Sequence, residues 1–324
     1  MTHRRKATSA AFSACAVAAA LVLTACSDSG SAPAPTPELG PAELALLTRS
    51  GGQALDEARL FHAETELIAA CMTAKGFPYR VDAFAPATGS YEEREIGLDT
   101  RRREGYGLYA RFSTERARKA ADTDSPTNDQ YVARLPAREA DAYLRALRGT
   151  PGDLREIRFG AGSTVTFSAV GCEADSRRRL FGDLDGWAAA MHIPQNLDAS
   201  LTDQVTRAPR YTAALRDWRT CMREKGHPYP TPEEASERLS TEFRKRGATE
   251  ELRRREIAVA VGDGECAARL HIPSTVLSLR KQYAASLPVA DRSRLHKVAE
   301  IWSRAVARAR DVSPTVRSHS TTDG

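Results

Sequence analysis

The strongest constraint on the fold is a nine-residue sequence that the chain contains twice. It reads CMTAKGFPY at residues 71–79 and CMREKGHPY at residues 221–229. Apolar residues at helical spacing lead into each copy, and in the second they end at Trp218, Cys221 and Met222. A glycine after the lysine can adopt the left-handed conformation that ends a helix, and the proline two residues later prevents continuation. Each copy therefore predicts the end of a helix whose cysteine lies on the buried face.

A second duplication follows the first. Each motif is followed by one more cysteine, Cys172 or Cys266, and each of these lies in a predicted helix that leads to a His-Ile-Pro sequence at His192 or His271. We interpret His-Ile-Pro as an interhelix loop whose proline starts the next helix. A metal-binding histidine is the alternative, but no carboxylate or second histidine keeps a fixed spacing to both copies. We thus expect a mostly α fold, with two related helical, disulfide-stapled repeats and one small β-hairpin.

The C-terminal part repeats the first pattern in a weaker form. A helix is predicted from Ser274 to Asp311, with a break at Pro288. Within it, WSRAVARAR from Trp302 resembles WRTCMREKG from Trp218, with alanine and valine in place of Cys-Met. We interpret this segment as a degenerate third copy that packs without a bridge.

The first repeat contains a large insertion, residues 80–170. Asn128 is expected to cap a short helix over residues 128–134, and a second helix is expected over residues 136–149. The sequence EIRFGAGSTVTF alternates as a hairpin does. Its facing apolar residues are Ile157 and Phe159 on one strand and Val165 and Phe167 on the other.

The first 25 residues are typical of a secretory signal peptide. A positive segment ending at Lys6 precedes 13 apolar residues, too few to span a bilayer. The segment ends in Leu-Thr-Ala-Cys, which matches a bacterial lipobox and predicts cleavage before Cys26 and a diacylglyceryl group, with acyl chains such as palmitate, on its sulfur. An ordinary cleaved signal with an incidental Cys26 is the alternative. Arg4-Arg5 also leaves the twin-arginine route open beside the general secretory route.

The segment after Cys26 contains almost nothing to bury, so we expect residues 26–40 to be a lipidated cysteine and a disordered tether. Two acyl chains give a stable anchor. The folded part should lie at the extracytoplasmic face of the cell membrane, with the membrane as its first partner. We divide it into a first repeat at 41–194, a second repeat with the terminal helix at 195–312, and a disordered tail at 313–324.

Four of the six cysteines remain once the leader and the lipidated residue are set aside: Cys71, Cys172, Cys221 and Cys266. An even number in an exported chain predicts two disulfides, with three possible connectivities. The economical pairing is one bridge per repeat, Cys71–Cys172 and Cys221–Cys266. No Cys-x-x-Cys sequence is present, so zinc-ribbon and thioredoxin-type sites have no support.

Several segments resemble a group of uncharacterised secreted lipoproteins of Streptomyces and related actinomycetes. The resemblance covers about residues 60–272 and rests on the sequences NDQYVARLP, AYLRALRG, GCEADSRRRLFGD, Trp-x-x-Cys-Met and EIAVAVGDGEC. It implies a helical, disulfide-stapled envelope protein and transfers no catalytic residue.

The charge of the chain argues against nucleic acid as a partner. The formal charge of +5 falls to +2 when the basic residues of the signal peptide are removed. Arginine triplets at 101–103, 177–179 and 253–255 would suit an anionic polymer, but three successive helical positions point in three directions. We interpret the triplets as solvated faces.

Motifs for catalysis, metal or cofactor binding are not found in the sequence. Gly-x-Ser-x-Gly, His-Glu-x-x-His and Gly-x-x-x-x-Gly-Lys are all absent. His62 and Glu66 are spaced as a helical metal pair, and Asp183 and Asp185 as a carboxylate pair for glycoside chemistry. We interpret the first pair as a solvated helix face and the second as turn residues. The sequence thus predicts no catalytic residue, no metal and no cofactor.

The insertion is where we expect a functional surface. Its aromatic and basic residues suit binding of a peptide or a glycan: Tyr91, Arg101, Arg102, Tyr106 and Tyr109. The prediction is a non-enzymatic binding, sensing or structural module of the cell envelope, which could also have an envelope-protein partner. The alternative is a cell-wall or small-molecule enzyme whose site is not visible in sequence.

Overall fold

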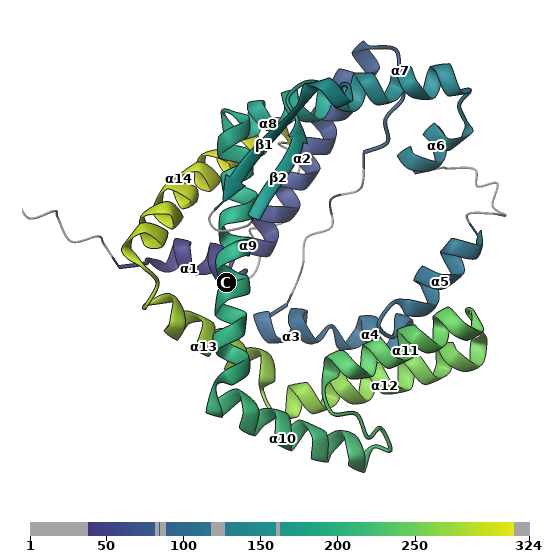
Figure 1. Ribbon diagram of the computed structural model, residues 1–324, viewed down its shortest axis with the longest axis vertical. Helices are drawn as coiled ribbons and strands as arrows, with labels where there is room; N and C mark the ends of the chain where they lie inside the picture. Colours follow the sequence, from purple (N-terminus) through teal and green to yellow (C-terminus); the bar gives the residue numbers. More distant parts are fainter. Residues whose placement is uncertain (1–37, 82–83, 85–88, 118–126, 160–162, 314–324) are drawn as a thin grey trace, which may run out of the picture. The chain divides into compact units, whose positions relative to one another are not determined.

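The computed structural model describes residues 38–81, 84, 89–117, 127–159 and 163–313. The predicted signal peptide, Cys26, nearly all of the predicted tether and the tail from residue 314 lie outside the described residues. The described residues belong to one compact unit. The fold is mostly helical with a single two-stranded hairpin among the described residues, as predicted (Figure 1).

The first repeat is built on α2 (Gln53–Ala74), α7 (Ala137–Arg148) and α8 (Cys172–Phe181). A disulfide joins Cys71 of α2 to Cys172 at the start of α8. Helix α7 packs on both, and its Tyr143 and Leu147 are buried against α2 and α8. The staple therefore closes a small three-helix unit around one apolar cluster.

The second repeat has the same order of helices, α10 (Pro209–Glu224), α11 (Pro232–Arg246) and α12 (Glu250–Arg269). Its disulfide joins Cys221 of α10 to Cys266 of α12. Helix α11 contributes Leu239 and Phe243 to the cluster that surrounds Trp218. Both disulfides confirm the predicted pairing of one bridge per repeat. Helix α11 corresponds to α7, because each lies between the two bridged helices of its repeat in the sequence and contributes to their apolar cluster.

Both copies of the repeated motif end a helix as predicted. Gly76 and Gly226 have φ values of 83° and 80°, which an L side chain rarely adopts. The next residue in each loop donates its backbone N–H to the carbonyl of the methionine, at 3.0 Å in the first copy and 2.8 Å in the second. These bonds satisfy carbonyls that the helix end would otherwise leave unpaired.

The two His-Ile-Pro sequences do not have the same structure. At the second copy, His271 has φ 48° and lies just before α13 (Ile272–Ala284), so the predicted loop is confirmed. At the first copy the prediction is wrong, because α9 (Leu184–Arg207) runs straight through Pro194. Pro194 is buried, and α9 packs along α13 and α14, so tertiary packing outweighs the backbone hydrogen bond that the proline removes.

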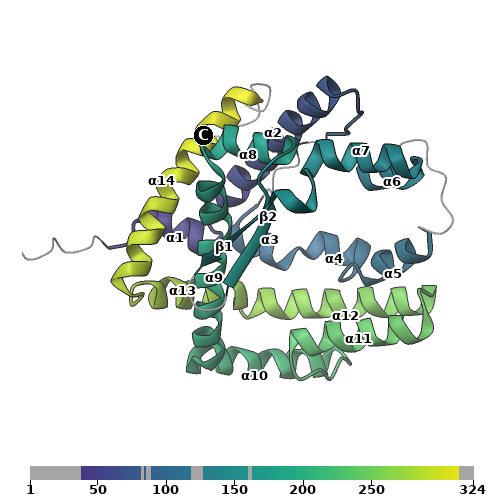
Figure 2. The ribbon, with the colours of Figure 1, turned by 45° about the horizontal axis from the view of Figure 1, so that its top comes forward.

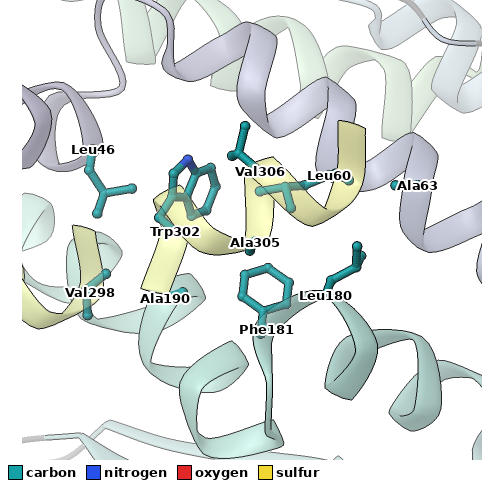
Figure 3. Close-up of a cluster of buried hydrophobic side chains, with 11 residues drawn as sticks. Leu46, Leu60, Ala63, Leu180, Phe181, Ala190, Val298, Trp302, Ala305 and Val306 are labelled. Carbon is teal, nitrogen blue, oxygen red and sulfur yellow. The ribbon is translucent and has the colours of Figure 1, made fainter. Parts of the chain in front are cut away.

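Helices α13 and α14 (Val289–Val312) confirm the predicted C-terminal helix and its break, since Pro288 is the N-cap of α14. The third copy lies on α14, where Trp302, Ala305 and Val306 are buried against α2, α8 and α9 (Figure 3). The short helix α1 (Pro41–Thr48) contacts α14, α9 and α13.

The insertion divides between the two repeats. Its first part forms α3 (Tyr91–Ile96), α4 (Leu98–Glu104) and α5 (Leu108–Ala117), and these helices contact α11, α12 and α13. Figures 1 and 2 both place α4 alongside α12. A segment inserted in the first repeat therefore packs on the second.

The second part of the insertion stays with the first repeat. Helix α6 (Asn128–Arg134) has the predicted bounds, but its N-cap is Thr127, which forms a capping box with Gln130. Asn128 instead exchanges two hydrogen bonds with the backbone of Arg80. A 3₁₀ turn, η1 (Pro151–Asp153), then leads to the hairpin.

The hairpin consists of the antiparallel strands β1 (Leu154–Phe159) and β2 (Ser163–Ser168). Ile157 lies opposite Val165 as predicted, whereas Phe159 pairs with Ser163 and Phe167 with Arg155. Strand β1 contacts α9, and Phe167 is buried there.

Two glycines within α12 explain how close its neighbours approach. A Cβ at Gly262 would lie 3.2 Å from the His227 ring, and a Cβ at Gly264 would lie 3.0 Å from the Arg101 side chain. Glycine within a helix normally weakens it. In the structure they admit the second motif loop on one side and α4 on the other.

No helix in the described ranges is long and apolar enough to cross a membrane.

Candidate functional site

The structure brings three of the five residues of the predicted binding surface to α12. Asp263, which is only 3% exposed, accepts hydrogen bonds from Arg101 at 2.6 Å, from the Tyr106 hydroxyl at 3.0 Å and from the Trp218 indole at 2.9 Å. Burial, followed by the nearby Asp263 carboxylate, raises the pKa of Tyr106. This buried carboxylate is fully hydrogen-bonded, as a buried charge must be.

Glu256 of α12 binds the segment at residues 106–109, and it does so through backbone N–H groups of that segment. Its carboxylate is fully buried and accepts the N–H groups of Tyr106, Leu108 and Tyr109 at 2.8, 2.7 and 2.9 Å. These N–H groups belong to the start of α5, so Glu256 caps that helix from α12. At Gly105, with φ 65°, a Cβ would lie 2.6 Å from Glu256 Cγ, so only glycine fits.

Tyr109 has further contacts on α12, and the remaining two residues of the predicted surface, Arg102 and Tyr91, also have partners within the chain. The Tyr109 hydroxyl donates to Glu250 at 2.6 Å, and Arg253 lies over its ring at 5.2 Å. Arg102 pairs with Asp99 at the surface, and burial raises the pKa of Tyr91, which lies near Arg280. In this structure four of the five side chains join the insertion to its neighbours, and the Arg102 pair lies within α4.

The other sequence candidates serve local structure. Asp183 is the N-cap of α9 and accepts the Gly186 N–H, whereas Asp185, also predicted as a turn residue, lies in the first turn of α9 and pairs with Arg155 of β1. His62 Nε2 lies 3.4 Å from Glu66 within α2, and His271 lies 2.9 Å from Glu92. The part of the chain that the structure describes holds no group of three or more His, Cys, Asp or Glu placed to bind a metal ion.

A pocket that the sequence did not indicate lies between α1, α2, α9 and α14. Its volume is about 500 Å³, and we call it the Trp302 pocket. Its wall includes the buried side chains of Leu46, Leu60, Phe181, Ala190 and Trp302, and Phe61 at its edge is 56% exposed. Figure 3 shows these buried side chains converging from the four helices and from the end of α8. An apolar wall of this size suits a small ligand with an apolar body.

Polar groups complete the lining of the Trp302 pocket. Arg49 pairs with Glu57 at 2.7 Å, and Glu64 accepts from Arg177 at 2.9 Å. Burial raises the pKa of Glu64 against the opposing effect of Arg177.

Asp198, across the pocket on α9, has the same character. Its Oδ1 lies 3.2 Å from Arg280 Nε, and burial raises its pKa against the opposing effect of that arginine. Each carboxylate in the lining therefore has an arginine partner.

Trp302 also has a hydrogen-bond donor without a partner. The residue is 8% exposed, and its indole N–H has no hydrogen-bond acceptor within the described chain. The ring borders a second pocket of about 320 Å³, which lies between α1, α2 and α14. Buried indole N–H groups nearly always find a partner, so this one marks a place where a ligand atom or water can bind.

No protein-family model, no curated protein and no solved structure matches this chain. The assignment of a site therefore rests on its geometry. The sequence held one signal for it, because the third copy keeps the tryptophan at Trp302 but no bridging cysteine.

Proposed function

We propose that this protein is a lipid-anchored, extracytoplasmic binding module that takes a small apolar or amphipathic ligand into the Trp302 pocket. The observation that carries the proposal is a pocket of about 500 Å³ that buried apolar side chains line beside the charged pairs, and that is bordered by Trp302, whose indole N–H has no partner among the described residues. The apolar wall would bind the body of the ligand, and Trp302 would bind an acceptor atom on it.

The proposed anchor is close to the pocket in sequence. Helix α1, which lines the pocket with Leu46 and Leu47, begins at Pro41, soon after the predicted lipobox cysteine. Diacylglyceryl modification of Cys26 would hold the chain at the membrane, since two acyl chains anchor stably. Cys26→Ala expressed in an actinomycete host should shift the protein from the membrane fraction to the medium. Equal membrane retention of both forms would contradict the anchor.

Binding is favoured over catalysis because of how the carboxylates are held. Glu57, Glu64 and Asp198 each lie beside an arginine, at 2.7, 2.9 and 3.2 Å. An arginine partner orients a carboxylate and favours its charged form, which suits a structural pair better than a group that must take up and release a proton.

Binding can be measured with N-phenyl-1-naphthylamine, a neutral apolar dye that fluoresces when it leaves water. Phe61→Ala removes an exposed ring at the edge of the pocket, and we expect it to weaken dye binding about fivefold. Leu154→Ala is the matched control, since Leu154 is 52% exposed and lies on β1, outside the lining. Equal dye binding by both variants and the wild type would contradict the proposed site.

One observation favours an enzyme as a second candidate. Burial raises the pKa of both Glu64 and Asp198 in one pocket, a feature shared by general acids. The mature chain incubated with peptidoglycan would then release soluble fragments, detected by mass spectrometry. Glu64→Gln and Asp198→Asn should each abolish that release, and unchanged release would exclude these residues as the acid.

A further inference from the structure

The second copy of the repeated motif lines a pocket of its own. The loop from Gly226 to Tyr229 borders a cavity of about 320 Å³ that we call the His227 pocket. Helix α11 contributes Arg238 and Glu242 to it, and α12 contributes Arg255. The pocket is therefore polar, in contrast to the Trp302 pocket.

The first copy of the motif has an apolar ring where the second has His227. Phe77 packs edge-on against the fully buried Tyr143 of α7, with ring centroids 5.4 Å apart, and joins the apolar cluster there. At the corresponding place in the second copy, His227 lies against Gly262 of α12 and hydrogen-bonds the backbone of Ala258. One residue difference between the two loops thus replaces a packed ring with a polar wall.

The charged groups of the His227 pocket come from two different helices. Arg255 pairs with Glu242 at 2.7 Å and hydrogen-bonds Tyr229, while Arg238 pairs with Glu234 at 2.6 Å. The side chains of Arg238 and Arg255 are 59% and 49% exposed, so a ligand can reach them. A guanidinium group has five N–H donors, and one carboxylate occupies at most two of them.

We propose that the His227 pocket binds the phosphate ester of a small polyol. The phosphate lies between Arg238 and Arg255, which suits a tetrahedral anion better than a planar carboxylate because the two guanidinium groups approach from separate helices. Glu242 would repel a bare anion, but it accepts a hydrogen bond from a ligand hydroxyl. This site is separate from the Trp302 pocket and does not depend on the function proposed for it.

A polyol phosphate can come from three sources: a free metabolite, a polyol-phosphate polymer of the envelope, or a lipid headgroup. The probes are therefore glycerol 3-phosphate, poly(glycerol phosphate) and vesicles containing phosphatidylglycerol, with glycerol and inorganic sulfate as comparisons. Binding is measured by titration calorimetry on the mature chain with Cys26→Ser, which keeps it free of lipid. The probe that binds most tightly identifies the source.

The decisive variant is Arg238→Gln with Arg255→Gln, matched by Arg244→Gln with Arg254→Gln. The control pair removes the same charge from the same two helices, at exposed residues outside the lining. We expect the Kd for glycerol 3-phosphate to rise at least about tenfold in the first pair and to change less than about twofold in the control. His227→Phe, which restores the residue of the first copy, should also abolish binding.

Three results would overturn the proposal: no binding of any of the three probes to the wild type, equal weakening by both variant pairs, or sulfate binding as tight as glycerol 3-phosphate. Circular dichroism confirms that each variant is folded. Binding of N-phenyl-1-naphthylamine should be the same in all of them, which separates this test from that of the Trp302 pocket.

Discussion

Trp218 and Trp302 occupy the same position in two copies of one helical pattern, yet their surroundings differ. In α10 the indole of Trp218 donates to Asp263 at 2.9 Å, and Cys221 three residues later is bridged to α12. In α14 Ala305 stands where Cys221 would be, and the Trp302 indole has no acceptor within the described residues. In α10 a disulfide and a buried carboxylate therefore fix the surroundings of the tryptophan. In α14 the tryptophan borders two pockets instead. The comparison shows that the copy without a bridging cysteine is the one in which the tryptophan borders open space rather than a buried carboxylate.

Removing the staple should have the largest effect. Cys221→Ala with Cys266→Ala makes the second copy resemble α14, and the closed loop of 45 residues predicts a loss of about 4 kcal/mol in the free energy of unfolding. Urea unfolding followed by circular dichroism measures it. A loss below about 1 kcal/mol would mean that packing alone holds the second repeat.

Removing the charge of Asp263 tests the carboxylate half of the comparison. Asp263→Asn keeps the size of the side chain but leaves the largely buried Arg101 without its ion pair. We expect a loss of about 3 kcal/mol, at the lower end for a broken buried pair because Arg101 remains partly exposed. The same urea experiment measures it. Arg101 also donates to the backbone carbonyls of Ile96 and Ala260, and an unchanged midpoint would show that these two bonds are enough to satisfy it.

Exchanging each tryptophan for phenylalanine tests the two copies directly. Trp218→Phe loses a hydrogen bond to a charged acceptor and Trp302→Phe loses none within the described chain, so the first should be about 1.5 kcal/mol more destabilising. Both changes remove the same volume, which makes each the control for the other. Equal losses would mean that the Trp302 indole has a partner, such as a retained ligand or water.

The smallest expected effect concerns pH and the second motif loop. Burial, together with Arg255 and Lys225, lowers the pKa of His227 below its usual value near 6.5. The unfolded chain therefore takes up the proton first, so this contribution to stability is complete above about pH 6.5 and decreases as the pH falls below it. His227→Gln should flatten the loss of stability between pH 7.5 and 5. An identical pH profile in variant and wild type would contradict the assignment.

Local signals explain how much of this fold the sequence predicted. The turns at Gly76 and Gly226 end their helices through backbone hydrogen bonds that span three or five positions, and the duplication itself suggested the disulfide pairing. Pro194 misled because its helix is maintained by α13 and α14, which lie far away in sequence. Gly262 and Gly264 admit the His227 ring and the Arg101 side chain, and no local pattern predicted that close approach.

Local signals of this kind could not predict the candidate site. The walls of the Trp302 pocket come from helices that lie far apart in the sequence, from α1 to α14. Its main feature is the Trp302 indole N–H, which has no acceptor among the described residues. The tyrosines and arginines of the insertion were predicted to form a binding surface, whereas Arg101, Tyr106 and Tyr109 contact α12. Their partners, Glu256 and Asp263, lie about 150 positions later, so no local pattern could distinguish a docking segment from an open surface.

The cap that Glu256 places on α5 also determines the order in which parts of the chain can fold. The N–H groups of Tyr106, Leu108 and Tyr109 find their acceptor in Glu256, which lies 147 to 150 positions further along the chain. A chain that emerges N-terminus first cannot close this contact until α12 has emerged and folded. Protease sensitivity at residues 106–109 would thus report whether the second half of the molecule is complete, and a chain cut short before α12 would display that segment to the quality-control proteases of its compartment.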